Sequence, residues 1–255
     1  MKTVILAGGL GTRLREETEF KPKPMVEIGE KPVLWHIMKT YATFGFKDFL
    51  ICTGYKGEVI KDFFLNYQLR SGDLDIDFAK NKFHNSADGE NLDWRLSIRN
   101  TGQLTNTGGR IFRVRDAISS RFFCTYGDGL SNIDIGELVK SHLASGKIAT
   151  LTAVNPASRF GVLKMGENSL VEEFEEKPAS DQWVNGGYFV FEPEIFNYMD
   201  ENCVLESDVL ARLASVGELN AYKHAGFWRP MDTYREFREL NEMWERKDAP
   251  WKIWH

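Results

Sequence analysis

The chain has 255 residues, 42% of them hydrophobic and 27% charged, so it is long enough for a large α/β domain with a full core. Its net charge of −5 argues against a general nucleic-acid binder, because such proteins need a basic surface. The sequence has no apolar run long enough to span a membrane, no signal-peptide pattern, and three cysteines without metal spacing. We therefore expect a cytoplasmic protein with no membrane or nucleic-acid partner and no structural zinc.

Hydrophobic periodicity and turn residues predict an alternation of strands and helices, followed by antiparallel strands and two closing helices. The expected strands are 3–7, 49–53, 74–78, 94–100, 122–126 and 149–154, and the expected helices are 33–44, 58–69, 108–118, 134–144, 206–215 and 233–245. Residues 85–91 are expected in an exposed loop or hairpin tip, and residues 160–191 in antiparallel strands. The pattern predicts an α/β fold: a Rossmann-like mixed, mostly parallel sheet flanked by helices, with a smaller antiparallel part. We expect one domain over residues 1–255.

The first strand leads into a glycine-rich loop that is typical of phosphate binding. Gly8, Gly9 and Gly11 have no Cβ atoms, so backbone N–H groups can approach a polyphosphate. Thr12 adds a hydroxyl and Arg13 adds paired donors that suit phosphate oxygens. The loop therefore predicts a nucleotide site, with a simple tight turn as the alternative.

Two familiar phosphate loops do not fit this spacing. No glycine is followed at the required distance by the Gly-Lys-Ser/Thr of a P-loop. A dinucleotide fingerprint would need glycine where Leu14 stands, and an acidic residue at the end of the next strand, which ends at Thr53. A Rossmann dehydrogenase is thus the weaker interpretation.

A rigid lysine follows the loop. Lys23 stands between Pro22 and Pro24, which fix its backbone, so its ammonium can turn back onto the same anion; a solvated basic turn is the alternative. The segments 6–14 (LAGGLGTRL) and 21–24 (KPKP) resemble the sugar-phosphate nucleotidyltransferases. This resemblance implies nucleotidyl transfer to a sugar phosphate.

Two aspartates are candidate metal ligands. Asp128 lies between glycines just after a predicted strand, where open α/β sheets bind ligands, although Asp-Gly is also a common turn. Asp232 precedes the last expected helix and could instead be its N-cap. Two carboxylates and a triphosphate are a usual way to hold Mg²⁺. In the family that the chain resembles, this pair holds the metal, which implies Mg²⁺ as cofactor.

The segments around Lys177 and Asn185 suit a hydroxyl-rich ligand. Lys177 precedes a proline, and Asn185 with Gly186 offers an amide and exposed backbone; a surface charge run and a turn are the alternatives. The resemblance implies that Glu176 and Lys177 contact the sugar and its phosphate, and that Asn185 and Gly186 line the sugar pocket.

Further motifs resemble the branch of the family that transfers a cytidylyl group from CTP to glucose 1-phosphate, giving CDP-glucose for bacterial surface polysaccharide. These motifs are 31–38, 54–57, 107–110, 126–129 and 227–233. The resemblance implies Arg13, Lys23 and Lys177 as catalytic residues, and a nucleotide site that comprises Leu6, Ala7, Gly8, Gly9, Leu10, Gly11, Thr12, Arg13, Lys23, Thr105, Arg110 and Gly127. It also implies a nucleotide-binding portion of about 1–150 and a sugar-phosphate-binding portion of about 151–255.

Physical reasoning leaves the substrates open, because the sequence does not show which groups face the base. UTP or dTTP, or another phosphorylated acceptor, are alternatives within the class. A catalytically dead homologue that only binds nucleotide sugars is the alternative outside it, and the retained charged residues weigh against it. A homo-oligomer is possible. Trp244, Trp251 and Trp254 either await a partner subunit or cover the protein's own core.

Overall fold

The computed structural model describes residues 1–69, 73–86, 92–156, 161–176 and 182–254. The strands are β1 (Lys2–Ala7), β2 (Glu27–Ile28), β3 (Lys31–Pro32), β4 (Asp48–Thr53), β5 (Asp73–Asp77), β6 (Lys82–Ser86), β7 (Arg95–Asn100), β8 (Phe122–Tyr126), β9 (Gly129–Ser131), β10 (Ala149–Val154), β11 (Val162–Met165), β12 (Val171–Glu175), β13 (Val184–Phe191), β14 (Leu219–His224) and β15 (Trp228–Pro230). The α-helices are α1 (Arg15–Thr18), α2 (Val33–Thr43), α3 (Gly57–Leu65), α4 (Thr107–Arg113), α5 (Ile135–Ser145), α6 (Ala211–Ser215) and α7 (Tyr234–Glu245). Short 3₁₀ turns and one π-helical turn, Leu205–Leu210, complete the described secondary structure.

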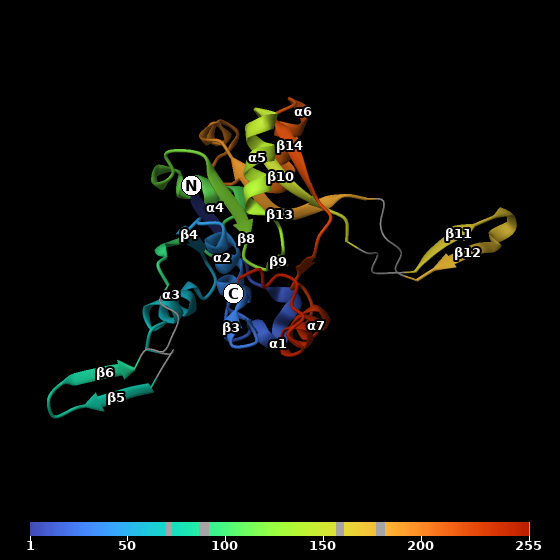
Figure 1. Ribbon diagram of the computed structural model, residues 1–255. Helices are drawn as coiled ribbons and strands as arrows, with labels where there is room; N and C mark the ends of the chain where they lie inside the picture. The colour runs from blue at the N-terminus through green and yellow to red at the C-terminus, as the bar shows by residue number, and fades with distance from the viewer. Residues whose placement is uncertain (70–72, 87–91, 157–160, 177–181, 255) are drawn as a thin grey trace.

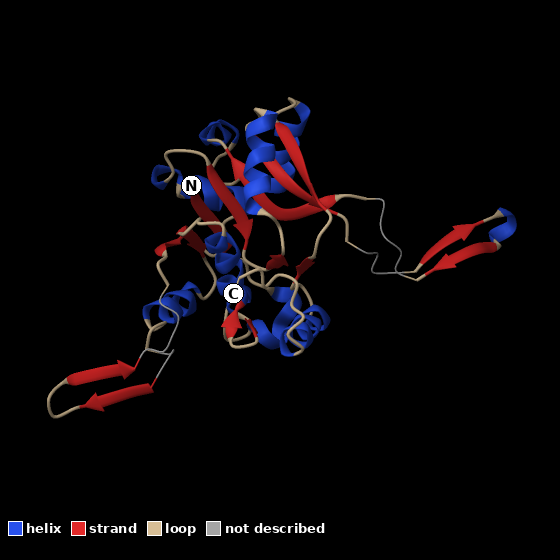
Figure 2. Ribbon diagram, viewed as in Figure 1, coloured by secondary structure: helices blue, strands red, loops and turns tan. Residues whose placement is uncertain are grey.

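A seven-stranded sheet forms the centre of the molecule, in the order β14-β10-β13-β8-β1-β4-β7 (Figures 1 and 2). Strand β1 pairs in parallel with β4 and β8, and β4 with β7. Strand β13 runs antiparallel to both of its neighbours, β8 and β10. The predicted mixed, mostly parallel sheet is confirmed, and residues from both ends of the chain share it.

Each face of the sheet carries its own hydrophobic core. Alternate residues of β1 point to opposite faces, so Ile5 joins one core and Val4 the other. The first core packs against α2, α5 and α7, and the second against α4 and the π-helical turn. Cys52 and Cys124 lie buried in the second core. Coverage of both faces explains why β1 reads as a continuous apolar run.

Local signals fix the helix ends. Asp134 accepts a hydrogen bond from the Glu137 N–H at the start of α5, and Gly146 ends that helix with a φ of 62°. Helix α7 begins with a capping box between Thr233 and Glu236. Thr233, and not Asp232, is therefore the N-cap of α7, which leaves the Asp232 carboxylate available for the site.

Most predicted elements are confirmed, with four differences. Strand β14 was not predicted; its sequence reads as a half-polar segment, but it adds to the edge of the sheet in parallel with β10. The helix expected over 108–118 ends at Arg113 and continues only as a 3₁₀ turn. The helix expected over 206–215 begins as the π-helical turn. Part of the loop expected over 85–91 belongs to β6, and residues 87–91 lie outside the described chain.

Two antiparallel hairpins, β5–β6 and β11–β12, lie away from the central sheet (Figure 1). Six apolar side chains of the segment that contains β11 and β12 are about half exposed or more. They are Val162, Leu163, Met165, Leu170, Val171 and Phe174. Two strands alone bury too little surface to be stable in water.

The C-terminal tryptophans cover the protein's own core. Trp251 is fully buried, and Trp244 and Trp254 pack against the same core. Their rings surround His36 of α2, with centroid distances of 4.9 Å for Trp244 and 6.3 Å for Trp251. Of the two interpretations of these tryptophans, the structure supports the intramolecular one.

Candidate active site

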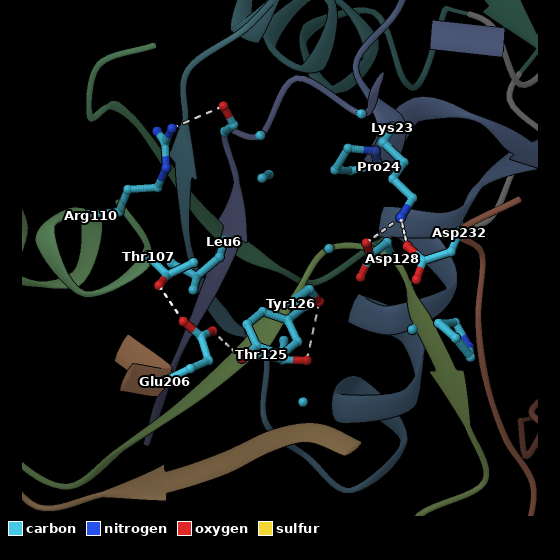
Figure 3. A pocket seen from close by; sticks show the side chains of 18 of the residues that line it. Leu6, Lys23, Pro24, Thr107, Arg110, Thr125, Tyr126, Asp128, Glu206 and Asp232 are labelled. Carbon is cyan, nitrogen blue, oxygen red and sulfur yellow. Dashed lines mark hydrogen bonds and ion pairs between the residues drawn. The ribbon is translucent and has the colours of Figure 1, made fainter. Parts of the chain in front are cut away.

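A cavity of about 700 Å³ opens beyond the carboxyl ends of β1 and β8 (Figure 3). Its walls include most of the predicted site residues: Leu6, Ala7, Gly8, Gly9, Gly11, Thr12, Lys23, Thr105, Arg110, Gly127, Asp128, Asn185, Gly186 and Asp232. Residues from the two halves of the sequence therefore meet in one cavity of the size that a nucleotide ligand needs.

Arg110 holds the glycine-rich loop in place. Its buried guanidinium donates to the backbone oxygen of Gly8 at 3.0 Å and to that of Gly102 at 2.7 Å, and it also donates to the Thr53, Thr101 and Gln103 oxygens. A Cβ on Gly8 would overlap this guanidinium, so the loop needs glycine there. Burial lowers the pKa of Arg110 below its ordinary value. Because its donors go to protein oxygens, Arg110 contributes a positive charge to this side of the cavity and holds the glycine-rich loop, and it does not offer a free pair of donors.

Lys23 lies between the two predicted metal carboxylates. Its Nζ is 2.6 Å from Asp128 Oδ2 and 2.6 Å from Asp232 Oδ1, and its side chain is only 10% exposed (Figure 3). Burial alone would lower the pKa of Lys23, but the two carboxylates outweigh burial and raise it. The ammonium is thus fully charged at neutral pH.

A small antiparallel pairing explains why two aspartates so far apart in sequence converge. Strand β9 follows Asp128 directly, strand β15 ends just before Met231, and the two strands pair with Pro230 opposite Gly129. The Met231 N–H then donates to the Asp128 backbone oxygen at 2.8 Å. These two strands were not predicted, because each is only three residues long and shows no periodicity.

The donor set of Asp128 and Asp232 fits Mg²⁺. The described residues include no cluster of three or more His, Cys, Asp or Glu side chains that could hold a metal. Mg²⁺ is usually bound by one or two carboxylates with substrate phosphates and water, so it needs no further protein ligand. The position of Lys23 shows that both carboxylates already point at one cation.

One wall of the cavity is a hydrogen-bond chain that sequence reasoning missed. Thr107 Oγ1 donates to Glu206 Oε2 at 2.7 Å, and the Tyr126 hydroxyl donates to Glu206 Oε1. Asn185 Nδ2 donates to the Tyr126 hydroxyl at 3.2 Å, and Asn185 Oδ1 accepts from the Gly187 N–H. Burial and the hydrogen bond to Glu206 raise the pKa of Tyr126, so the hydroxyl remains a donor. Tyr126 was predicted as the end of a strand and as part of the 126–129 motif, and Glu206 only as the start of a helix.

Four predicted site residues lie elsewhere or are not fully described. Leu10 is 42% exposed and does not line the cavity, and Glu176 follows β12 outside the lining. Arg13 lies in the 3₁₀ turn Thr12–Leu14, and only its backbone is described. Lys177 lies outside the described residues.

The mixed sheet and a cavity beyond the carboxyl ends of its strands are typical of α/β enzymes that bind phosphorylated ligands. A family model described as Nucleotidyl transferase matches residues 2–243, and the chain belongs to this family. Over 261 aligned residues that cover all of both chains, it is 48% identical to the glucose-1-phosphate cytidylyltransferase of Salmonella typhi and 48% identical to that of Salmonella typhimurium.

A solved structure supports the fold. The crystal structure of HddC from Yersinia pseudotuberculosis matches with a TM-score of 0.69 and 23% identity, covering 95% of this chain and 99% of that chain. No helix in the described part of the chain has the length and apolar character needed to cross a membrane.

Proposed function

We propose that the protein transfers a cytidylyl group from CTP to α-D-glucose 1-phosphate, giving CDP-glucose and pyrophosphate. The observation that carries the reaction type is the meeting of Lys23, Asp128 and Asp232 at the mouth of the glycine-rich loop. The choice of CTP and glucose 1-phosphate is supported by 48% identity, over the whole length, to two proteins named glucose-1-phosphate cytidylyltransferase.

The chemistry needs no general base. A phosphate monoester has a second pKa near ~6, so the sugar phosphate is already a dianionic nucleophile at neutral pH. Its oxygen forms a bond to the α-phosphorus of CTP while the bond to the bridging oxygen of pyrophosphate breaks in line. This agrees with the lining of the cavity, in which no described residue is a histidine or cysteine.

The obstacle is repulsion between two polyanions, and the positive groups of the cavity offset it. Two unit charges 4 Å apart interact by about 4 kcal/mol at an effective dielectric of 20. When bound by Asp128 and Asp232, Mg²⁺ would neutralise phosphate charge and orient the α-phosphate. Lys23 then exchanges its carboxylate partners for phosphate oxygens, which its charged state allows. Arg13 and Lys177 are assigned to the same phosphates by resemblance.

We assign the two ligands to two portions of the cavity. The nucleotide belongs to the portion from about residues 1–150, with Leu6 to Thr12, Thr105, Arg110 and Gly127. The sugar phosphate belongs to the portion from about 151–255, with Glu176, Lys177, Asn185 and Gly186. The support is that the glycine-rich loop and the segment of Asn185 and Gly186, which are far apart in the sequence, both line one cavity.

We also propose that the protein assembles with copies of itself and works in the cytoplasm. The exposed apolar side chains of the β11–β12 hairpin support self-association, because exposure of apolar surface to water is unfavourable. The three free, buried cysteines support a reducing compartment. Light scattering after size-exclusion chromatography measures the assembly directly; a monomer at micromolar concentration contradicts it.

The proposed reaction is tested by pyrophosphate release with Mg²⁺ and glucose 1-phosphate, run separately with CTP, UTP, dTTP, ATP and GTP. Release with CTP alone is expected. Release with UTP or dTTP instead would contradict CTP as the substrate but would still agree with nucleotidyl transfer. No pyrophosphate release with any of the five nucleotides would contradict the proposed transfer.

A further inference from the structure

The Glu206 carboxylate is a charged group in the wall of the cavity without a cationic partner among the described residues. Its two oxygens accept hydrogen bonds from two neutral hydroxyls, those of Thr107 and Tyr126. Glu206 lies on the π-helical turn Leu205–Leu210, and such turns occur frequently at functional sites. The side chain is half-buried, so this charge is partly withdrawn from water.

The carboxylate has capacity for a further donor. An ionised carboxylate offers about four lone-pair sites, and Thr107 and Tyr126 use two of them. Phosphate has no donor and carries the same sign of charge, so the phosphates are repelled from this wall. The group that Glu206 suits is a neutral donor, such as a hydroxyl.

The position of the hydrogen-bond chain favours the sugar, and not the base, as the ligand group that Glu206 contacts. The chain continues from Glu206 through Tyr126 to Asn185, and the Gly186 backbone beside it is fixed by a 2.7 Å hydrogen bond from Trp228 Nε1 to the Gly186 oxygen. Figure 3 shows Glu206 between Thr107 and Tyr126, on the opposite side of the Leu6 end of β1 from the Arg110 guanidinium. Glu206 thus belongs to the wall that carries Asn185.

We infer that Glu206 is a specificity-determining residue whose carboxylate accepts a hydrogen bond from a hydroxyl group of the sugar phosphate. Thr107 and Tyr126 are positioning residues that hold the carboxylate at this wall. A sugar that lacks the contacted hydroxyl leaves a partly desolvated carboxylate short of a donor, so the site rejects it. This inference rests on the proposed sugar-phosphate acceptor.

The test compares Glu206→Gln with the matched control Glu245→Gln, an exposed residue at the end of α7. Calorimetry measures binding of glucose 1-phosphate and of its 2-, 3-, 4- and 6-deoxy analogues, with a CTP analogue that cannot be cleaved. We expect Glu206→Gln to weaken glucose 1-phosphate about tenfold or more, because hydrogen bonds to charged groups are among the stronger ones. For one deoxy analogue, wild type and Glu206→Gln should bind equally, and Glu245→Gln should match wild type throughout.

Two results overturn the inference. One is equal weakening of glucose 1-phosphate and all four deoxy sugars, which would indicate a general distortion of the cavity. The other is unchanged sugar binding with a shifted preference for CTP over UTP, which would place Glu206 at the base. Because binding is measured without turnover, a wild type that binds the sugars in the expected pattern but releases no pyrophosphate would contradict only the proposed reaction.

A second variant protects the test against a misfolded Glu206→Gln protein. Tyr126→Phe keeps the carboxylate and removes the hydroxyl that orients it. We expect a smaller loss of affinity for glucose 1-phosphate, and discrimination weakened against the same deoxy analogue. The shorter side chain of a third variant, Glu206→Asp, should also weaken binding of glucose 1-phosphate. The inference is overturned if folded Tyr126→Phe discriminates among the deoxy sugars as wild type does and Glu206→Asp binds glucose 1-phosphate as wild type does.

Discussion

The ammonium of Lys23 lies 2.6 Å from the carboxylate of Asp128, although 104 residues separate them in the chain (128 − 23 − 1). The same ammonium lies 2.6 Å from Asp232, so a protein cation occupies the point where both carboxylates converge. Ligand binding at this point must therefore redistribute three charges, and each of them can be tested by substitution.

Asp128→Asn should abolish pyrophosphate release while the protein remains folded. Its side chain is 31% exposed, and Lys23 retains Asp232 as a partner, so we expect a loss of stability on the order of 1 kcal/mol. Loss of a metal carboxylate should lower turnover by about 10³-fold or more. Turnover and thermal unfolding are measured together, with Asp116→Asn, an exposed aspartate that does not line the cavity, as control. A folded, active Asp128→Asn protein would falsify the metal assignment.

Site residues that directly follow a predicted strand could be placed from the sequence, but the convergence of distant segments on the cavity could not. Gly8 and Asp128 follow strands of typical length and composition, so their place beyond the sheet followed from general rules. The position of Asp232 in the cavity depends on the pairing of β9 with β15, and these strands are too short to show a periodicity in the sequence. The position of Glu206 depends on a π-helical turn, and local helix propensity does not distinguish such a turn from an ordinary α-helix.

Strand β14 was not predicted because its sequence lacks the pattern of a buried strand. Its residues are half-polar because it lies at the edge of the sheet, where one side is exposed to water. Alternation in such a strand is weak, and its pairing with β10 comes from tertiary contact. The central strands β1, β4 and β8 carry continuous apolar runs because both of their faces are covered, so they were predicted correctly.

Arg110→Lys should destabilise the protein and also weaken its binding of CTP. Arg110 is 4% exposed and its guanidinium hydrogen-bonds to five protein oxygens, whereas a lysine has only three donors on one nitrogen. We expect a loss of about 3 kcal/mol, because buried acceptors stay unsatisfied. Denaturant unfolding measures this loss, with the more exposed Arg115→Lys as control. Equal midpoints for the two variants would show that Arg110 does not hold the glycine-rich loop.

His36 should make the protein less stable in mild acid. Burial lowers the pKa of His36 from 6.5 to about 4 in the folded chain. Well above pH 6.5 the ring is uncharged in both states, so its titration does not affect unfolding there. Between pH 6.5 and 4 the unfolded chain binds a proton that the folded chain does not, so the free energy of unfolding falls by about 3 kcal/mol.

The measurement for His36 is denaturant unfolding of wild type and His36→Gln at several pH values from 7.5 to 4. Glutamine cannot titrate and retains a donor for the Ile28 oxygen, to which His36 Nε2 lies at 3.0 Å. The difference in stability between the two proteins should therefore change in favour of His36→Gln as the pH falls. Parallel curves for the two proteins would exclude His36 as the source.

Gly29 and Gly146 offer a matched pair that separates backbone strain from side-chain overlap. Both have positive φ, 64° and 62°, so alanine at either position costs about 1 kcal/mol of strain. A Cβ at Gly146 meets no atom within 4 Å, whereas a Cβ at Gly29 would overlap the indole of Trp244. That indole packs on His36 and Trp251, so it cannot move without opening the core. Gly29→Ala should thus lower the free energy of unfolding by roughly 1–3 kcal/mol more than Gly146→Ala. Equal losses in denaturant unfolding would mean that the C-terminal tryptophans repack freely, and that their contact with α2 contributes little to the fold.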